Sequence, residues 1–118
     1  MSQAPMSPIT THVLDTARGL PAAGLRIRLE VRSGTGRWRT LGRGITDPSG
    51  RLATLLPEGR PRRGVYRLTF DTAAYFRARQ LRCFYPSVNV VFEIRDSNEH
   101  YHVPLLLSPF GYQTYRGS

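Results

Sequence analysis

The chain has 118 residues, of which 40% are hydrophobic, and a formal net charge of +9. This length corresponds to one ordinary domain, and we expect a tail at residues 1–7 and a single domain over residues 8–118. The single cysteine, Cys83, excludes an intrachain disulfide. No stretch reaches the roughly 18 apolar residues of a membrane span, and no basic, apolar leader is visible, so we expect a cytoplasmic protein without a membrane partner.

All 17 basic residues are arginines. A basic domain that binds nucleic acid gathers its arginines on one face or one helix. Here the arginines are spread over several segments, with groups at residues 26–32, 37–43 and 60–63. The complete absence of lysine is typical of a compositional bias. We therefore favour a solvated basic surface over a nucleic-acid site, and we expect no nucleic-acid partner.

The first two predicted strands are ITTHVLD (9–15) and LRIRLEVR (25–32). The second places four aliphatic side chains on one face and four charged side chains on the other, the period of a half-buried antiparallel strand. A weaker strand, WRTLGRGIT (38–46), contains two glycines and precedes DPSG (47–50), which predicts a turn. RLATLL (51–56) is expected to return against that weaker strand.

A loop is predicted at 57–64 from its proline and glycine content, before a strand VYRLTFD (65–71). TAAYFRARQL (72–81) contains good helix formers and no proline, so it predicts a helix with Thr72 as its N-cap.

SVNVVFEI (87–94) predicts another strand, and YHVPLLL (101–107) with GYQTYR (111–116) predicts a closing hairpin. Pro104 has no N–H to donate, so its strand should be an edge strand or be bulged there. About eight strands at this spacing predict an all-β sandwich.

The chain has three histidines, His12, His100 and His102. His100 and His102 are two residues apart, so they face the same way if both lie in a strand. With His12 they are candidates for a metal site, but no carboxylate stands at a suitable spacing, and we favour no metal. General acid–base chemistry is the alternative, because the imidazole pKa is about 6.5. A Ser–His–Asp triad has little support, because no G-x-S-x-G segment is present.

The C-terminal run EHYHVPLLLSPFGYQTYRGS (99–118) resembles the signature of the 5-hydroxyisourate hydrolases, transthyretin-like enzymes of purine catabolism that typically end in Tyr-Arg-Gly-Ser. Three further segments resemble other motifs of that family: ITTHVLDTARGLPAAGL (9–25), TDPSGRL (46–52) and CFYPSV (83–88). Transthyretin shares the fold, carries hormone in its channel and lacks this ending.

The resemblance implies a transthyretin-like sandwich of two four-stranded sheets with one short helix. It also implies a homotetramer, a dimer of dimers with the active sites in its channel. The implied reaction is hydrolysis of 5-hydroxyisourate to 2-oxo-4-hydroxy-4-carboxy-5-ureidoimidazoline, a step of urate degradation that needs no cofactor.

Carried over by position, the resemblance implies catalytic roles for His12, Arg51 and His102. We expect His102 to be the general base, His12 to orient the water and Arg51 to donate to the oxyanion. His100 is expected nearby or at the surface. The residues implied to bind substrate are Tyr115, Arg116, Gly117 and Ser118. A small-ligand carrier on the same fold and a basic nucleic-acid-binding domain are the alternative functions.

Overall fold

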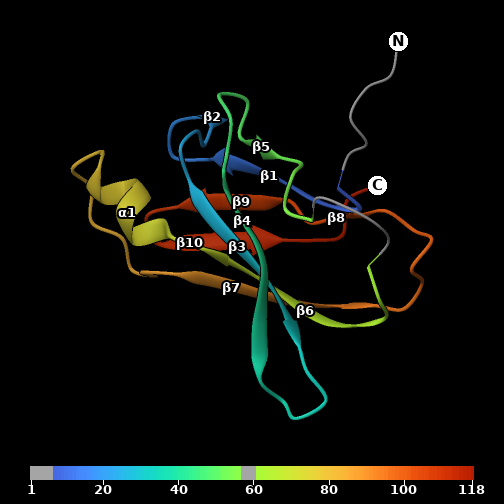
Figure 1. Ribbon diagram of the computed structural model, residues 1–118. Helices are drawn as coiled ribbons and strands as arrows, with labels where there is room; N and C mark the ends of the chain where they lie inside the picture. The colour runs from blue at the N-terminus through green and yellow to red at the C-terminus, as the bar shows by residue number, and fades with distance from the viewer. Residues whose placement is uncertain (1–6, 57–60) are drawn as a thin grey trace.

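The computed structural model describes residues 7–56 and 61–118. Two β-sheets lie face to face, and one short helix lies at one end of the sandwich (Figure 1). Ser7, expected in the tail, is only 4% exposed, and its Oγ accepts hydrogen bonds from the main-chain N–H groups of Ile9 and Leu56. The folded part therefore includes Ser7, while the rest of the expected tail, residues 1–6, lies outside the described residues.

The first sheet is built around β1 (Ile9–Asp15) and follows the order β10-β9-β1-β2, with β5 and β8 also paired with β1. β8 and β9 run parallel to β1, whereas β2 and β5 run antiparallel to it. The other strands of this sheet are β2 (Leu20–Pro21), β5 (Arg51–Leu52), β8 (Tyr101–His102), β9 (Leu105–Ser108) and β10 (Gly111–Thr114).

The second sheet is antiparallel and follows the order β4-β3-β6-β7. Its strands are β3 (Arg26–Arg32), β4 (Trp38–Ile45), β6 (Gly64–Phe70) and β7 (Val88–Ile94). The two-sheet sandwich is confirmed. The first sheet contains more than four strands because the two-residue strands β5 and β8 pair with β1 beside the four-strand path.

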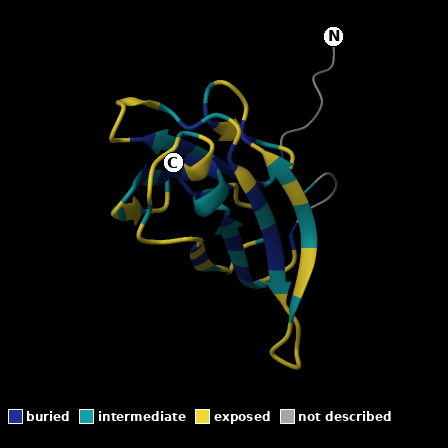
Figure 2. Cartoon of the chain, turned by 90° about the vertical axis from the view of Figure 1, so that its left-hand side faces the viewer, coloured by how far each residue is buried: buried dark blue, intermediate teal, exposed yellow. Residues whose placement is uncertain are grey.

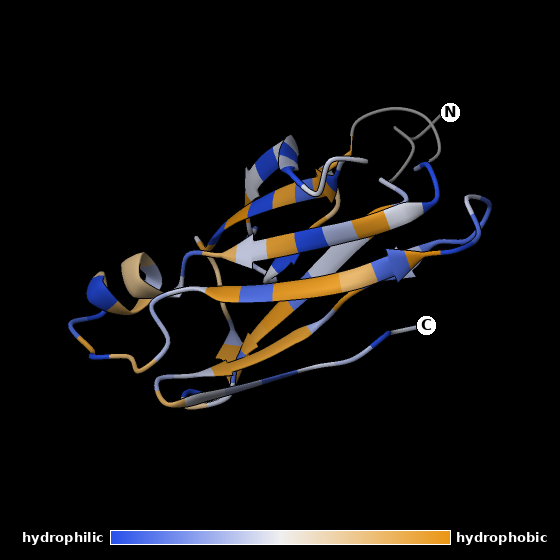
Figure 3. Cartoon of the chain, turned by 90° about the horizontal axis from the view of Figure 1, so that it is seen from below, coloured by the Kyte–Doolittle hydropathy of each residue, from blue (hydrophilic) through white to orange (hydrophobic). Residues whose placement is uncertain are grey.

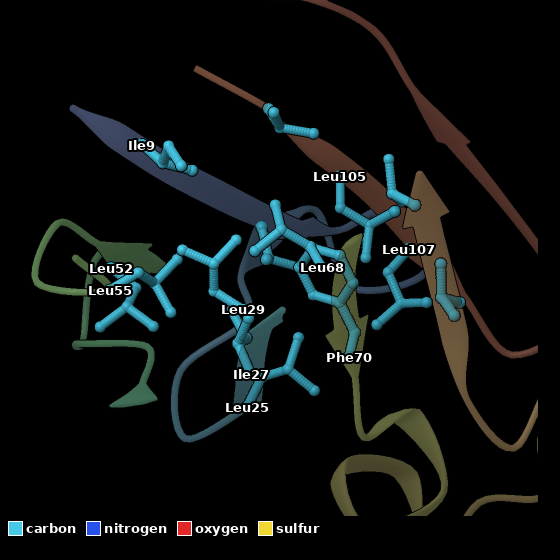
Figure 4. Close-up of a cluster of buried hydrophobic side chains, with 14 of the residues drawn as sticks. Ile9, Leu25, Ile27, Leu29, Leu52, Leu55, Leu68, Phe70, Leu105 and Leu107 are labelled. Carbon is cyan, nitrogen blue, oxygen red and sulfur yellow. The ribbon is translucent and has the colours of Figure 1, made fainter. Parts of the chain in front are cut away.

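The core lies between the two sheets. Apolar and polar residues alternate along the strands (Figure 3), and Figure 2 shows that the buried positions lie between the layers, whereas the β3–β4 turn is exposed. Side chains from both sheets point toward one another in Figure 4. Those labelled include Ile27, Leu29, Leu68, Phe70, Leu105 and Leu107. Each fully buried large aliphatic side chain stabilises the fold by about 1.5–3 kcal/mol.

The segment 51–56 does not pair with β4 as expected. Arg51 and Leu52 form β5, which pairs with β1, and the segment packs across β4 at its glycines. A Cβ on Gly42 would lie 1.8 Å from the carbonyl oxygen of Leu55, so the two main chains meet face to face instead of edge to edge. Of the predicted loop 57–64, residues 57–60 lie outside the described residues, and Gly64 begins β6.

The helix α1 (Thr72–Arg77) is shorter than predicted, and its N-cap is Asp71 instead of Thr72. The Asp71 carboxylate accepts the Ala74 N–H at 3.1 Å, whereas the buried Thr72 hydroxyl donates to the Tyr85 carbonyl. Thr72 thus holds the loop that follows the helix. Cys83, in that loop, is half-buried and packs against the core. Among the described residues, no helix has the length and apolar character needed to cross a membrane.

The predicted strand 101–107 is broken at Val103 and Pro104, which separate β8 from β9. Pro104 predicted either an edge strand or a bulge. β9 lies between β1 and β10, so it is not an edge strand, and the irregularity at Pro104 takes the form of this break. The break accommodates the missing N–H, and the Pro104 carbonyl accepts the Thr114 hydroxyl at 2.7 Å. β8 therefore forms a separate short strand that brings His102 to β1.

Candidate functional site

Strand β1 carries two polar side chains on the face that points away from the core. Thr10 and His12 are two residues apart and share that face, while Thr11 and Val13 point into the sandwich, where both are buried. The buried Thr11 hydroxyl donates to the Val103 carbonyl at 2.6 Å.

Two short strands bring further polar residues beside these positions. In β5, Arg51 is the register partner of His12, and in β8, His102 is the register partner of Thr10. Register partners in neighbouring strands present their side chains on the same face of a sheet. The structure thus brings together the three predicted catalytic residues from segments that are far apart in sequence.

The turn before β5 positions Arg51. The Asp47 carboxylate accepts hydrogen bonds from the Ser49 N–H at 2.9 Å, the Ser49 hydroxyl at 2.6 Å and the Arg51 N–H at 3.0 Å. These bonds, that of the Ser49 hydroxyl first, hold the pKa of Asp47 below its usual value. Gly50 in the turn has φ of 80°, a conformation that favours glycine. The Arg51 side chain is exposed beside His12.

His12 is held by the same turn. Its Nε2 lies 2.8 Å from the Ser49 carbonyl oxygen. A carbonyl oxygen only accepts hydrogen bonds, so Nε2 carries a proton, and in the neutral ring the lone pair lies on Nδ1. His12 therefore presents Nδ1 as its acceptor atom.

His102 is held on two sides. Its Nδ1 lies 2.8 Å from the Thr10 hydroxyl, and its main-chain carbonyl accepts the Gly117 N–H at 2.8 Å. A Cβ on Gly117 would lie 2.6 Å from Cδ2 of the His102 ring, so the C-terminal segment passes directly against the imidazole. Figure 1 shows this segment returning to β8. Within residues 7–56 and 61–118, no hydrogen bond occupies Nε2 of His102.

The surroundings of His102 favour its neutral form. Partial burial lowers the pKa of His102 most, and the nearby His100, His12 and Arg51 lower it further, while the contact with Thr10 acts in the opposite direction. A neutral imidazole with an unoccupied Nε2 has the properties of a general base.

The predicted substrate-binding residues are only partly brought to this place. Gly117 contacts His102, and Ser118 follows it. Tyr115 is 53% exposed and lies with Arg116 in a groove beside β7. Arg116 Nη2 donates to Glu99 at 2.7 Å, and its guanidinium lies 4.5 Å from the centre of the Tyr101 ring. Among the described residues, Arg116 therefore contacts Glu99, Tyr101 and the main chain of His100, and no hydrogen bond joins it or Tyr115 to a histidine side chain.

The carboxylates of Asp15 and Glu99 have partners other than the histidine rings. Asp15 is buried and accepts the Tyr75 hydroxyl at 2.8 Å, and Glu99 pairs with Arg116. Among the described residues, no cluster of three or more histidine, cysteine, aspartate or glutamate side chains has the arrangement of a metal site.

Thr10 was missed in the sequence, and His100 was left without a role. The hydroxyl of Thr10 lies 2.9 Å from Nε2 of His100 as well as 2.8 Å from Nδ1 of His102. His100 lies just before β8 and is exposed. The available signal was the spacing of Thr10 and His12, which predicts that both side chains lie on one face of the strand.

Comparisons with known proteins extend over almost the whole chain. The sequence model of the HIUase/Transthyretin family matches residues 9–117. The chain is 49% identical over 113 residues to a 5-hydroxyisourate hydrolase of Mus musculus, which covers 95% of this chain and 96% of the mouse protein.

Two solved structures have the same fold. A 5-hydroxyisourate hydrolase of Klebsiella pneumoniae superposes with a TM-score of 0.81 at 36% identity, covering 93% of this chain and 98% of that one. Sea bream transthyretin in complex with thyroxine superposes with a TM-score of 0.88 at 33% identity, covering 93% of this chain and 94% of that one.

Proposed function

The chain belongs to the HIUase/transthyretin family, and on this premise we propose that His12, Arg51 and His102 catalyse the hydrolytic opening of 5-hydroxyisourate. The protein is a hydrolase of urate degradation, and its product is 2-oxo-4-hydroxy-4-carboxy-5-ureidoimidazoline. The observation that carries the proposed site is the meeting of two imidazoles and a guanidinium on one face of β1.

His102 is the general base. Its Nδ1 is engaged by Thr10, so Nε2 is the atom that takes a proton from the attacking water. The lowered pKa of His102, caused first by burial and then by the neighbouring cationic and imidazole groups, keeps the ring neutral near pH 7. A positioned base of this kind accelerates a reaction by about 10²–10⁴-fold.

His12 orients the water, and Arg51 stabilises the charge that develops on the substrate. The Ser49 carbonyl fixes the His12 ring, which leaves Nδ1 to accept a hydrogen bond from the water. Arg51 presents a planar set of N–H donors beside His12, suited to the oxyanion formed when water adds to the ring carbonyl. The oxygen of the added water stays bonded to the carbonyl carbon. The ring C–N bond then breaks, and the leaving nitrogen receives a proton.

The active assembly is a homotetramer, a dimer of dimers. Two features of a single subunit support this proposal. β7 and β10 each end their sheet, and unprotected edge strands readily pair with other chains. Exposed aromatic side chains also gather around β10; they are Phe84, Tyr85, Phe110 and Tyr112. In the assembly, Tyr115, Arg116, Gly117 and Ser118 bind the substrate in a site shared between subunits.

A turnover assay tests the proposed function. Freshly generated 5-hydroxyisourate is mixed with the protein, and its loss is followed by absorbance with and without a chelator. We expect rapid loss that the chelator leaves unchanged, and a decrease of kcat by about 10²–10⁴-fold in His102→Ala. Binding of thyroxine, the ligand of the sea bream structure, without turnover would instead favour the small-ligand carrier alternative, and inhibition by the chelator would favour a metal site.

A further inference from the structure

One buried hydroxyl connects the two C-terminal histidines. Thr10 is 4% exposed, and its Oγ1 lies 2.9 Å from His100 Nε2 and 2.8 Å from His102 Nδ1. The centres of the two imidazole rings are 6.4 Å apart, so the rings do not hydrogen-bond each other directly. In the described part of the chain, the Thr10 hydroxyl has no further hydrogen-bond partner.

The single proton of the Thr10 hydroxyl limits how Thr10, His100 and His102 can hydrogen-bond to one another. A hydroxyl has one proton to donate and two lone pairs to accept with, so Thr10 donates to only one of the two rings. If it donates to Nδ1 of His102, the neutral His102 ring carries its proton on Nε2, where it cannot act as a base. If it donates to Nε2 of His100, Nδ1 of His102 carries the proton and Nε2 is free.

We propose that Thr10 is a positioning residue that holds His102 in its Nδ1–H tautomer and connects it to His100, which stores the catalytic proton. This inference rests on the proposed function, because a base acting at Nε2 of His102 requires the second arrangement. Nothing in the family resemblance or in the spacing of the histidines assigns a role to Thr10.

The proton transfer balances in each half of the reaction. His102 Nε2 takes a proton from the attacking water while Nδ1–H passes its proton to the Thr10 oxygen. The Thr10 hydroxyl proton passes to His100 Nε2, which becomes an imidazolium. In the second half the same transfers run in reverse, and Nε2–H of His102 protonates the leaving nitrogen. No oxidant, metal or further reactant is needed.

The charges around the two rings favour storing the proton on His100. His102 is half-buried on β8 and faces His12 of β1, Arg51 of β5 and the His100 ring, all of which disfavour a positive charge there. His100 is exposed, so a proton placed on its ring remains in contact with water. The charged groups near His100 are Glu99 and Arg116, which form an ion pair with each other.

Nitrogen NMR of the histidine rings tests the tautomer without any substrate. In the wild-type protein labelled with ¹⁵N-histidine, we expect His102 to show the Nδ1–H pattern. Thr10→Val removes the hydroxyl with little change in volume and should shift His102 toward the Nε2–H tautomer, whereas Thr10→Ser should retain the wild-type pattern. Thr11→Val is the matched control, because Thr11 is its neighbour on β1 but points into the core.

Kinetics then separate tautomer control from proton storage. We expect kcat to fall by about 10-fold or more in Thr10→Val, because a buried nitrogen loses its partner, and to recover to within a few-fold in Thr10→Ser. His100→Gln still offers Thr10 an acceptor but cannot take a proton, so it should keep the His102 tautomer and lower kcat. Thr11→Val should keep both the wild-type ring pattern and the wild-type kcat.

The outcomes distinguish this inference from the proposed function. An Nε2–H pattern for His102 in an active wild-type protein would overturn the role of Thr10 and leave the hydrolase intact. So would a Thr10→Val variant with an unchanged ring pattern and full kcat, and full kcat in His100→Gln would overturn proton storage. A wild-type protein that has the Nδ1–H pattern but does not consume 5-hydroxyisourate would overturn the proposed function instead.

Discussion

Gly117 shows how closely the C-terminal segment is fitted to the proposed base. Its N–H bonds to the His102 carbonyl, and its Cα faces the edge of the imidazole ring. The family resemblance implied that this glycine helps to bind the substrate. In the subunit, the close approach is to His102.

Gly117→Ala should therefore displace the His102 ring. The added Cβ would lie 2.6 Å from Cδ2 of His102 and 3.2 Å from Cγ of Pro104. A misplacement of about 1 Å costs about 10²-fold in rate, so we expect a decrease in kcat of that order with the melting temperature little changed. Gly111→Ala is the control, because its Cβ would meet only Ser108 Oγ at 3.7 Å. Equal kcat in the two variants would contradict this account of Gly117.

The pH dependence of the reaction should report His102. Its folded-state pKa lies below its usual value, chiefly because burial disfavours the imidazolium form. The base is active when neutral, so kcat/KM should be constant near pH 7 and fall only below about pH 6.5. Between the lowered folded-state pKa of His102 and its unfolded-state pKa, the unfolded chain binds more protons than the folded protein. The free energy of unfolding therefore also decreases as the pH falls through this window. An acid limb centred above pH 7 would contradict this assignment.

At the level of elements, β4 and the segment after β5 meet through their main chains. The glycines of β4 remove the side chains that would otherwise separate the two, and this contact places Leu55 in the core. The same contact supports β5, which carries Arg51 to its position beside His12. The two glycines that weakened the prediction of a strand, Gly42 and Gly44, thus leave room for the Leu55 carbonyl and the Leu52 side chain.

Gly42→Ala should strongly destabilise the protein. Its Cβ would lie 1.8 Å from the Leu55 carbonyl oxygen, a main-chain atom that cannot rotate away. Overpacking of a core costs about 1–3 kcal/mol, and we expect a loss of unfolding free energy at the upper end of this range in a denaturant titration. Gly34→Ala, where a Cβ would meet nothing within 4 Å, should leave the unfolding free energy within about 0.5 kcal/mol of wild type. Similar curves for both variants would argue against the close contact.

At the scale of the whole molecule, β7 and β10 each lie at one end of a sheet, and they are the strands through which we propose that subunits assemble. The exposed aromatic rings near β10 contact one another, with Tyr85 and Tyr112 centred 5.2 Å apart. Such a surface is typical of an interface between protein chains. The groove that holds Tyr115 and Arg116 is lined by residues of β7 and by Thr114 at the end of β10.

Tyr112→Lys should weaken the assembly. We expect the wild-type protein to sediment with about four times the 13.3 kDa chain mass, and the variant to sediment as smaller species with a lower kcat. Burying a charge at an interface is costly, which is the reason for the dissociation. Ile45→Lys changes an apolar residue on β4, at the far end of the second sheet, that is 56% exposed against 43% for Tyr112, and this variant should keep the wild-type mass. A wild-type monomer with full activity would contradict the shared site.

Most strands were predictable, because alternation of apolar and polar residues depends only on the chain itself. The segment 25–32 became β3 with its aliphatic residues inside, and 87–94 became β7. Thr72 was misassigned as the N-cap because its competing partner, the Tyr85 carbonyl, comes from a loop that local sequence does not place. The pairing of 51–56 was wrong for a related reason, since the register of a strand depends on the whole sheet.

Strand periodicity and the Tyr-Arg-Gly-Ser run at residues 115–118 are properties of neighbouring residues, so a two-sheet β protein of the hydrolase and transthyretin family could be recognised from the chain alone. That Arg51 lies beside His12, that Gly117 packs on His102, and that Thr10 connects His102 with His100 became visible only in the folded protein. These contacts could not be foreseen because they join positions up to 92 residues apart. Their geometry depends on how β5 and β8 pair with β1, and no local pattern encodes that pairing.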